Sequence, residues 1–498
     1  MAFWWVHRLV YFLIAYSIIK LYLILDIYQQ SHYHIRDYFK FFINNFVFND
    51  ACVLIAGILG AYSDNIWLII FSGSYLILYC LFYFQLKVKL VFSKRIIKLI
   101  SLSILYIIAV SFIPYANPYL LLLIEFSIVP ILYLEGLVSN LINRKYIISA
   151  KDKLDKYKGI KVVITGSYGK TSTKLLFNQL LNVYHSSIQT PKSYNTPLGI
   201  SKFINNEYID MYRYLVLEYG ASQKNDIKRL LDISKPDVAI VTEIGFMHMN
   251  SFKTIENVIE EKMLITKNAS VVILNYDNDY IRNYPLKHSC ILSYGFFHGD
   301  YNARNINGGA FDLYYKNEFV IRLESNLVGK HQILNLLAGL SYAHYKGFNL
   351  ERLKNAVKLF KVEANRLELK KYGNRHVLDD SFNSNLKGFV EALRVLGEYK
   401  CKRILITPGI VELGKYQNEI YNELALHIAK NVDVAILVGY KECKSLYEKL
   451  KKYNMELYVA QSFIEGYSLY LSIIKGLDSS ALLIENDLPD IYKRGLKF

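Results

Sequence analysis

Two long uncharged stretches lie in the first 150 residues of the chain. Residues 65–86 contain no formal charge, and residues 99–124 form a second stretch that Pro114 and Pro118 interrupt. A helix needs about 20 apolar residues to cross the hydrocarbon core of a bilayer. We therefore predict one membrane span over 65–86 and a helical hairpin from about 97 to 138 that turns near Pro118.

The basic residues that flank these stretches predict their orientation. They are Lys87, Lys89, Lys94, Arg95 and Lys98 before the hairpin, and Arg144 and Lys145 after it. Short loops rich in Lys and Arg usually face the cytoplasm. With two weaker candidates at residues 9–28 and 51–63, we predict three to five spans in a bacterial-type plasma membrane and catalytic domains in the cytoplasm. Lys20 and Glu125 lie within apolar stretches, where each either snorkels near a helix end or contacts the head of a lipid-linked ligand.

Charge separates the first 150 residues from the rest of the chain. They contain 11 of the 59 Lys and Arg residues and 6 of the 43 Asp and Glu residues. The net charge of +16 is spread along the chain without a basic tail, so we do not expect nucleic acid as a partner. The five cysteines form no CxxC pair, which argues against a zinc site and a disulfide framework.

A strand, a glycine-rich turn and a helix follow one another after a polar linker at 151–158. IKVVIT at 160–165 has the pattern of a buried strand, GSYGKT at 166–171 that of a turn, and LLFNQLLNVY at 175–184 that of a helix. The backbone amides of such a turn surround phosphate oxygens, its lysine reaches the terminal phosphate and its hydroxyl residue binds Mg²⁺. Ile164 stands where the general P-loop pattern has a glycine. The residues expected to bind ATP here are Gly166, Ser167, Gly169, Lys170, Thr171 and Ser172.

TGSYGKT at 165–171 resembles the loop of the Mur ligases, ATP-dependent enzymes that join an amine to a carboxylate in peptidoglycan precursors. Further similarities follow in the order of that family. TPKSYNTPLGI at 190–200 is similar to its asparagine-rich segment, LVLEYGA at 215–221 to a strand that ends in a Mg²⁺-associated glutamate, and DVAIVTEIGFMH at 237–248 to a turn that ends in a metal-associated histidine. The resemblance implies that Glu218 and His248 bind metal together with Thr171. Taken alone, Glu218 is more typical of a solvated strand end and His248 of a loop.

ENVIEEK at 256–262 resembles the helix whose lysine the family converts into a CO₂ carbamate. A carbamate turns an ammonium into an anion that is able to hold a second Mg²⁺. The resemblance therefore implies that Lys262 is a metal ligand and that Lys170, His248 and Lys262 are catalytic. The family usually has a glutamate two residues after this lysine, where the chain has Leu264, and a helix-surface lysine is the alternative interpretation.

Later segments point to one branch of the family. LNYDND at 274–279 and GKHQILN at 329–335 resemble two family segments, and the second implies a nucleotide contact for Asn335. NRLE at 365–368 is similar to GRLE, and LDDSFNSN at 378–385 to the DDSYNAN of the D-alanyl-D-alanine-adding (MurF-like) member. GIVELG at 409–414 is similar to GDMLELG of the same member. The resemblance implies that Arg366, Asp380 and Asn383 reach the nucleotide across a domain cleft.

The chain also departs from the family in two places. The predicted membrane region occupies the place of the UDP-sugar-binding domain, so the resemblance covers about 340 of the 498 residues. IENDLPD at 484–490 replaces a Lys-Gly-Ser-Arg sequence, which favours an amine other than D-alanyl-D-alanine; its acidic groups either receive an ammonium or form a solvated turn. We predict an α-helical transmembrane region at 1–150, an α/β P-loop Mur ligase central domain at 151–362 and a Rossmann-like C-terminal domain at 363–498.

The resemblance implies a membrane-anchored ligase that uses ATP and Mg²⁺ to form an amide bond through an acyl phosphate. Its partners are a carboxylate acceptor, lipid-linked in the simplest scheme, an amino acid or amine donor, and membrane lipid. The sequence leaves the oligomeric state open. Two alternative functions are a membrane ATPase that couples hydrolysis to transport or regulation, and an inactive nucleotide-binding scaffold.

Overall fold

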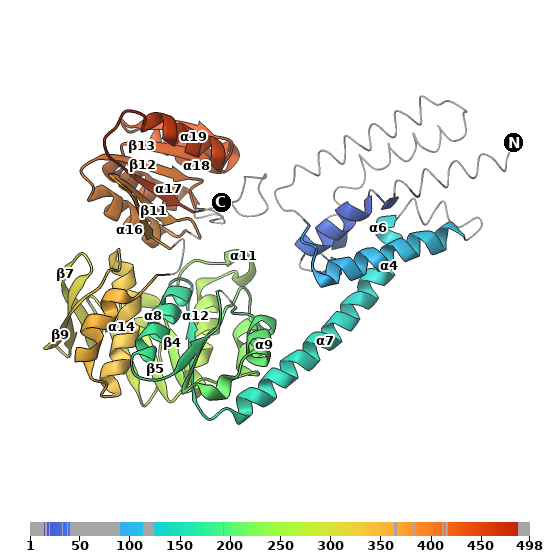
Figure 1. Ribbon diagram of the computed structural model, residues 1–498, viewed down its shortest axis with the longest axis horizontal. Coiled ribbons are helices and arrows are strands. Elements are labelled where there is room, and N and C mark those ends of the chain that lie inside the picture. The colour runs from blue at the N-terminus through green and yellow to red at the C-terminus, as the bar shows by residue number, and fades with distance from the viewer. Residues whose placement is uncertain are drawn as a thin grey trace. The chain divides into compact units, whose positions relative to one another are not determined.

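The computed structural model describes residues 14, 17–18, 20–31, 33–36, 38–39, 90–112, 124–192, 194–362, 366–382, 384–410, 413 and 417–486. The chain divides into two compact units, residues 1–144 with 489–498 and residues 145–488. In the described part of the first unit, helices α4 (Lys94–Ser111), α6 (Ile124–Ser127) and the beginning of α7 (Val129–Lys156) share a buried apolar cluster (Figure 1). Arg95 pairs with the buried Glu135 at 2.7 Å within this unit.

The helices of the described residues overturn the membrane prediction. None of them combines the length and the apolar character that a crossing requires. Of the stretch at 99–124 the structure describes residues 99–112 and Ile124; the first turns of α4 contain Lys94, Arg95 and Lys98, and α7 contains Glu135. The predicted transmembrane region is therefore wrong for the described residues, and the predicted integral membrane localisation, which depends on it, is wrong as well. The proposed spans at 65–86 and 51–63 lie outside the described residues.

The larger sheet of the second unit has the strand order β2-β3-β1-β4-β5-β6-β7-β8-β9. Neighbouring strands from β2 to β7 are parallel, and β7, β8 and β9 pair antiparallel. The strands span Ile160–Thr165 (β1), Ser187–Gln189 (β2), Tyr214–Glu218 (β3), Val238–Val241 (β4), Val271–Asn275 (β5), Ile291–Gly295 (β6), Tyr301–Asn307 (β7), Ala310–Tyr315 (β8) and Glu318–Glu324 (β9).

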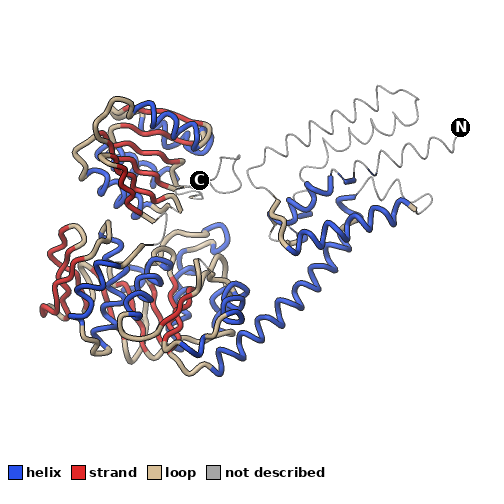
Figure 2. The backbone as a smooth tube through the Cα atoms, in the orientation of Figure 1, coloured by secondary structure: helices blue, strands red, loops and turns tan. Residues whose placement is uncertain are grey.

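Helices cover both faces of this sheet, as Figure 2 shows. One apolar core joins it to α8 (Lys170–Asn182) and α14 (Lys330–Tyr345), where the rings of Phe177 and Tyr342 lie 5.5 Å apart. A second core joins the other face to the end of α7, α9 (Pro197–Asn206), α10 (Asp226–Leu231) and α12 (Ile255–Met263). Strands that are buried on both faces consist of continuous apolar residues, which explains the strong strand signal of IKVVIT. The shorter helices are α11 (Met249–Phe252), α13 (Asp279–Arg282), α15 (Leu353–Ala356) and the 3₁₀ turns Ile209–Met211, Leu264–Asn268, Leu350–Arg352 and Val357–Leu359.

The smaller sheet has the order β10-β11-β15-β12-β13-β14, and all its pairs are parallel except β10 with β11. Helices α16 (Leu386–Gly397), α17 (Gln417–Asn431) and α18 (Tyr440–Leu450) pack on one core, and α19 (Phe463–Ile473) packs on the other. The strands span Glu368–Tyr372 (β10), Arg375–Asp380 (β11), Lys402–Thr407 (β12), Val434–Val438 (β13), Glu456–Ala460 (β14) and Ser480–Glu485 (β15). The α/β part of the predicted fold, with a central and a C-terminal sheet, is confirmed. The predicted domain boundaries remain predictions.

Candidate active site

The loop at 166–169 lies at the carboxyl edge of the larger sheet. Ile164 pairs in register with Glu218 of β3, and Thr165 pairs with Val241 of β4, so three strands end around this loop. Ligands of open α/β sheets bind at this edge. Gly169 precedes α8 with φ 77°, and a Cβ there would lie 2.8 Å from Asn335 Oδ1. Both the left-handed backbone and the close side chain therefore require glycine at 169.

Two lysines converge on the carbonyl oxygen of Gly166. Lys170 Nζ donates to Gly166 O at 2.8 Å and to Ser167 O at 3.0 Å, and Lys262 Nζ donates to Gly166 O at 2.9 Å. Lys262 is only 2% exposed. Burial, together with the charge of Lys170, holds the pKa of Lys262 well below its ordinary value. Burial also lowers the pKa of Lys170, and Glu218 partly offsets this effect. The site thus concentrates basic groups where a phosphate would neutralise them.

Glu218 is held by a lysine to which the sequence analysis assigned no role. Lys174 Nζ lies 3.2 Å from Glu218 Oε2, and both side chains are 1% exposed. Asn195 Nδ2 donates to the other carboxylate oxygen at 3.0 Å, and Lys174 also donates to Lys192 O. The spacing in the sequence could have pointed to Lys174. It follows Lys170 by four residues, and residues four apart lie on the same face of a helix.

Glu261, the residue before Lys262, fixes the position of α12. Its carboxylate accepts from the backbone amides of Asn225 at 2.9 Å and Ile227 at 2.7 Å. It therefore anchors α12 to the beginning of α10. No local pattern in the sequence points to this role of Glu261, because both amides lie more than 30 residues away in the chain.

The predicted metal ligands are only partly assembled. Thr171 and Ser172 are buried on the first turn of α8, and Glu218 ends β3. His248 is exposed before α11 and has φ 54°. Among the described residues, no group of three or more His, Cys, Asp and Glu side chains is placed to hold a metal ion. The Thr171 hydroxyl and the Glu218 carboxylate nevertheless fit Mg²⁺, which is often held by one or two protein oxygens, water and substrate phosphates.

Residues of the smaller sheet reach the phosphate loop. Arg366 Nη2 lies 3.5 Å from Thr171 Oγ1, and its guanidinium stands 4.4 Å above the ring of Phe382. Asp380 accepts a hydrogen bond from the backbone amide of Leu367 at 3.1 Å, which holds it next to Arg366. Lys387 of α16 pairs with Glu243 at 2.8 Å, just after β4. The predicted turn at Asp380 is therefore linked to the loop through Arg366, and Asn383 lies outside the described residues.

Two other predicted residues serve to build the loop. Ser167 Oγ accepts from the backbone amide of Gly245 at 3.1 Å, which connects the loop to the segment after β4. Asn335 Oδ1 accepts from Thr173 Oγ1 at 3.2 Å, which ties α14 to α8. Both hydrogen bonds hold Ser167 and Asn335 beside the glycine turn. Neither bond shows whether these side chains contact the nucleotide.

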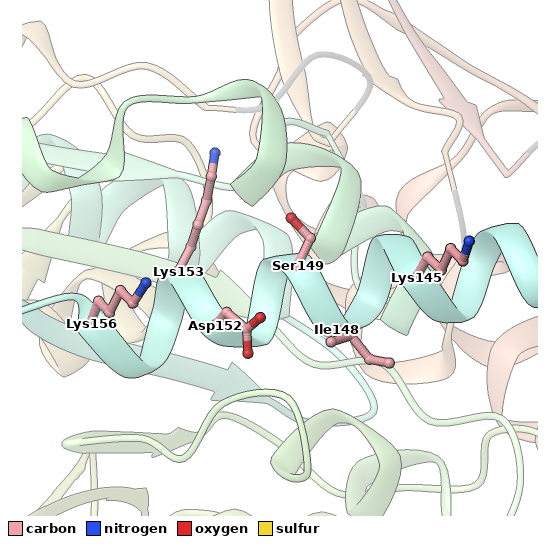
Figure 3. A pocket seen from close by; sticks show the side chains of 6 residues that line it. All are labelled: Lys145, Ile148, Ser149, Asp152, Lys153 and Lys156. Carbon is pink, nitrogen blue, oxygen red and sulfur yellow. The ribbon is translucent and has the colours of Figure 1, made fainter.

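A separate hollow of about 410 Å³ lies along α7 (Figure 3). Its lining residues all belong to that one helix and include Lys145, Asp152 and Lys156. Lys153 there donates to the carbonyl oxygens of Ile204 and Asn205 at 3.3 and 2.9 Å and thereby attaches α7 to α9. A hollow with a single helix as its wall leaves most of a ligand in water, whereas ligand sites usually enclose their ligands. The phosphate loop is therefore the better candidate site.

Comparison with known proteins agrees with this geometry. Residues 164–343 match the family model of the Mur ligase middle domain. The UDP-N-acetylmuramoyl-tripeptide--D-alanyl-D-alanine ligase of Borreliella burgdorferi is 26% identical over 361 residues, which are 66% of this chain and 72% of the relative. A ligase of the same name from Buchnera aphidicola subsp. Acyrthosiphon pisum is 24% identical over 363 residues. The matched region is 69% of this chain and 78% of that relative.

Solved structures share the fold. MurF of Thermotoga maritima in complex with ADP has a TM-score of 0.62 and 22% identity, and the match covers 70% of this chain and 81% of that one. MurF of Acinetobacter baumannii has a TM-score of 0.62 and 21% identity, over 69% and 77% of the two chains. Residues 164–343 thus form a Mur ligase middle domain, and the similarity of about two thirds of the chain to MurF-like ligases identifies it as an ATP-dependent ligase that forms carbon–nitrogen bonds.

Proposed function

We propose that this chain activates a substrate carboxylate with ATP bound at residues 166–172 and then joins it to an amine. The convergence of Lys170 and Lys262 on Gly166 O carries this proposal. Phosphoryl transfer depends mainly on positioning and on neutralising charge, and Lys170 supplies positive charge at the loop. The names of the relatives favour a UDP-N-acetylmuramoyl peptide as the carboxylate substrate and an amino acid or dipeptide as the amine.

In the proposed reaction an acyl phosphate forms first, and the amine displaces its phosphate second. A carboxylate oxygen attacks the γ-phosphorus of ATP, ADP leaves and an acyl phosphate forms. The amine nitrogen then attacks the acyl carbon, phosphate leaves and the amide remains after loss of a proton. Bound Mg²⁺ supplies neutralising charge on the phosphates. In this scheme Lys170 holds the terminal phosphate, Thr171, Glu218 and His248 are metal ligands, and the nucleotide contacts are Asn335, Arg366, Asp380 and Asn383.

Lys262 is the proposed site of a CO₂-derived carbamate. Its amine is buried beside Lys170, and its low pKa favours the neutral form that reacts with CO₂. The neutral amine and CO₂ form an N–C bond and release one proton, so an uncharged group is replaced by an anion. The product would place a negative charge beside the ammonium of Lys170 and add an oxygen ligand for a metal ion.

ADP release should distinguish a ligase from an ATPase. With ATP and Mg²⁺, the full chain is expected to release ADP only when both UDP-N-acetylmuramoyl-tripeptide and an amine are present. D-alanyl-D-alanine, L-lysine and alaninamide serve as the amines, and amide formation is followed by mass spectrometry. ADP release at the same rate without carboxylate and amine would instead favour hydrolysis as the function.

The Lys262→Ala variant is expected to lose about 10²-fold or more of this activity, and added bicarbonate should not restore it. Lys267→Ala, five residues away on an exposed position, is the matched control and should retain activity. Carbon-13 NMR of the wild-type protein in labelled bicarbonate should show a carbamate signal that is lost in Lys262→Ala but kept in Lys267→Ala. Full activity of Lys262→Ala would remove the carbamate from the scheme.

A further inference from the structure

Glu218, a proposed metal ligand, is neutralised by a side chain of the phosphate-loop helix. Lys174 Nζ of α8 lies 3.2 Å from Glu218 Oε2, and both side chains are 1% exposed. The ammonium donates to Lys192 O, and within the described residues Glu218 Oε2 accepts no hydrogen bond. Lys174 therefore balances the charge of this carboxylate, while Oε2 keeps lone pairs that a further cation can use.

The segment after β2 also holds this carboxylate in place. Asn195 Nδ2 donates to Glu218 Oε1 at 3.0 Å. The backbone oxygen of Asn195 accepts from Gly220 N at 2.9 Å, and a Cβ at Gly220 would lie 2.7 Å from Asn195 Cγ. Only a glycine at 220 allows this close approach. The carboxylate therefore has a defined orientation, in which an amide holds Oε1 and an ammonium lies beside Oε2.

The charges around Glu218 are unfavourable for a metal ion that arrives alone. Burial lowers the pKa of Lys170, and the charge of Glu218 opposes this change, so the carboxylate acts on the phosphate-loop lysine as well as on Lys174. In the described part of the chain, no three His, Cys, Asp or Glu side chains gather into a metal-binding group. A divalent cation gains little from a carboxylate whose charge an adjacent ammonium balances.

A bound nucleotide changes this balance. Its phosphates bring several negative charges to the first turn of α8, which contains Lys170 and Thr171 and directly precedes Lys174. Mg²⁺ in such sites is usually held by one or two carboxylates together with substrate phosphates and water. With the phosphates present, their attraction for the ion outweighs the repulsion by the ammonium of Lys174.

We propose that Lys174 is a positioning residue that makes metal binding at Glu218 depend on the nucleotide. It orients the carboxylate and balances its charge until the phosphates arrive, so a divalent ion binds there only together with them. The inference rests on the proposed role of Glu218 as a metal ligand and deepens it, because it sets the order in which nucleotide and metal ion bind.

Titration of the full chain with Mn²⁺ in the absence of nucleotide tests this dependence apart from catalysis. Mn²⁺ takes the same oxygen ligands as Mg²⁺, and electron paramagnetic resonance measures its free concentration. When wild type and Mn²⁺ are mixed in equal sub-millimolar amounts, most of the metal should stay free. Lys174→Met should bind Mn²⁺ at least about tenfold more tightly, because Glu218 then carries an uncompensated charge. The double variant Lys174→Met with Glu218→Gln should lose this gain.

Lys402→Met is the matched control, because it removes a lysine from the exposed ion pair with Glu456 and should bind Mn²⁺ as the wild type does. Circular dichroism checks the fold of each variant, and Lys174→Gln takes the place of Lys174→Met if the latter does not fold.

A purely structural role of Lys174 would lower the stability of these variants without any gain in Mn²⁺ binding. That result, or capture of most of the Mn²⁺ by the wild type without nucleotide, would overturn the proposal. A failure of the ligase function would appear instead in the ADP release assay, which these titrations do not involve.

Discussion

Replacing Lys170 with alanine is expected to reduce ATP-dependent amide formation by about 10³-fold. Lys170 Nζ lies at the glycine turn, where it donates to the carbonyl oxygens of Gly166 and Ser167. A bound γ-phosphate would exchange these contacts for charge-assisted ones that strengthen as charge develops during transfer. The variant should therefore lose turnover much more than it loses ADP affinity.

Single-turnover assays with labelled ATP and nucleotide titrations would measure these two effects. Lys267→Ala, on an exposed position of the 3₁₀ turn Leu264–Asn268, provides the control for removal of a lysine from the same unit of the chain. Circular dichroism should show that Lys170→Ala keeps its secondary structure. Turnover within a few fold of the wild type would contradict the role of Lys170 at the transferred phosphate.

Lys174→Met is expected to lower the free energy of unfolding by about 3–5 kcal/mol. The substitution leaves the carboxylate of Glu218 buried at 1% exposure without the ammonium that lies 3.2 Å from it. Asn195 alone does not neutralise that charge. The double variant Lys174→Met with Glu218→Gln should recover much of this loss, because it removes the uncompensated charge as well.

Urea denaturation followed by circular dichroism would measure these differences. Lys402→Met is a matched control, because Lys402 and Glu456 form a 2.6 Å ion pair whose side chains are 32% and 50% exposed. Its loss should cost less than about 1 kcal/mol, since water and salt screen an exposed pair. Equal losses for Lys174→Met and Lys402→Met would show that the buried pair does not stabilise the fold as inferred.

The phosphate loop and the membrane region differ in what the sequence encodes locally. The strand, turn and helix at 160–182 depend on local features: an apolar run, a glycine that tolerates φ 77° and a helical pattern. The membrane prediction depended on counting uncharged residues, and such a count does not show where a helix begins and ends. In the described residues α4 contains Lys94, Arg95 and Lys98 and α7 contains Glu135, so charged residues lie within the helices that extend from the uncharged stretches.

The sequence by itself determined the phosphate loop and the order of the family segments, because each is encoded by neighbouring residues. Only the tertiary structure decided which side chains meet. Lys262 reaches Gly166 across 96 residues, Lys174 pairs with Glu218, and Glu485 lies beside Asp380. These contacts follow from the strand orders β3-β1-β4 and β11-β15-β12, which place distant strand ends next to one another. Local spacing does not specify that order, because it is decided only when the strands and helices pack together and bury both faces of each sheet.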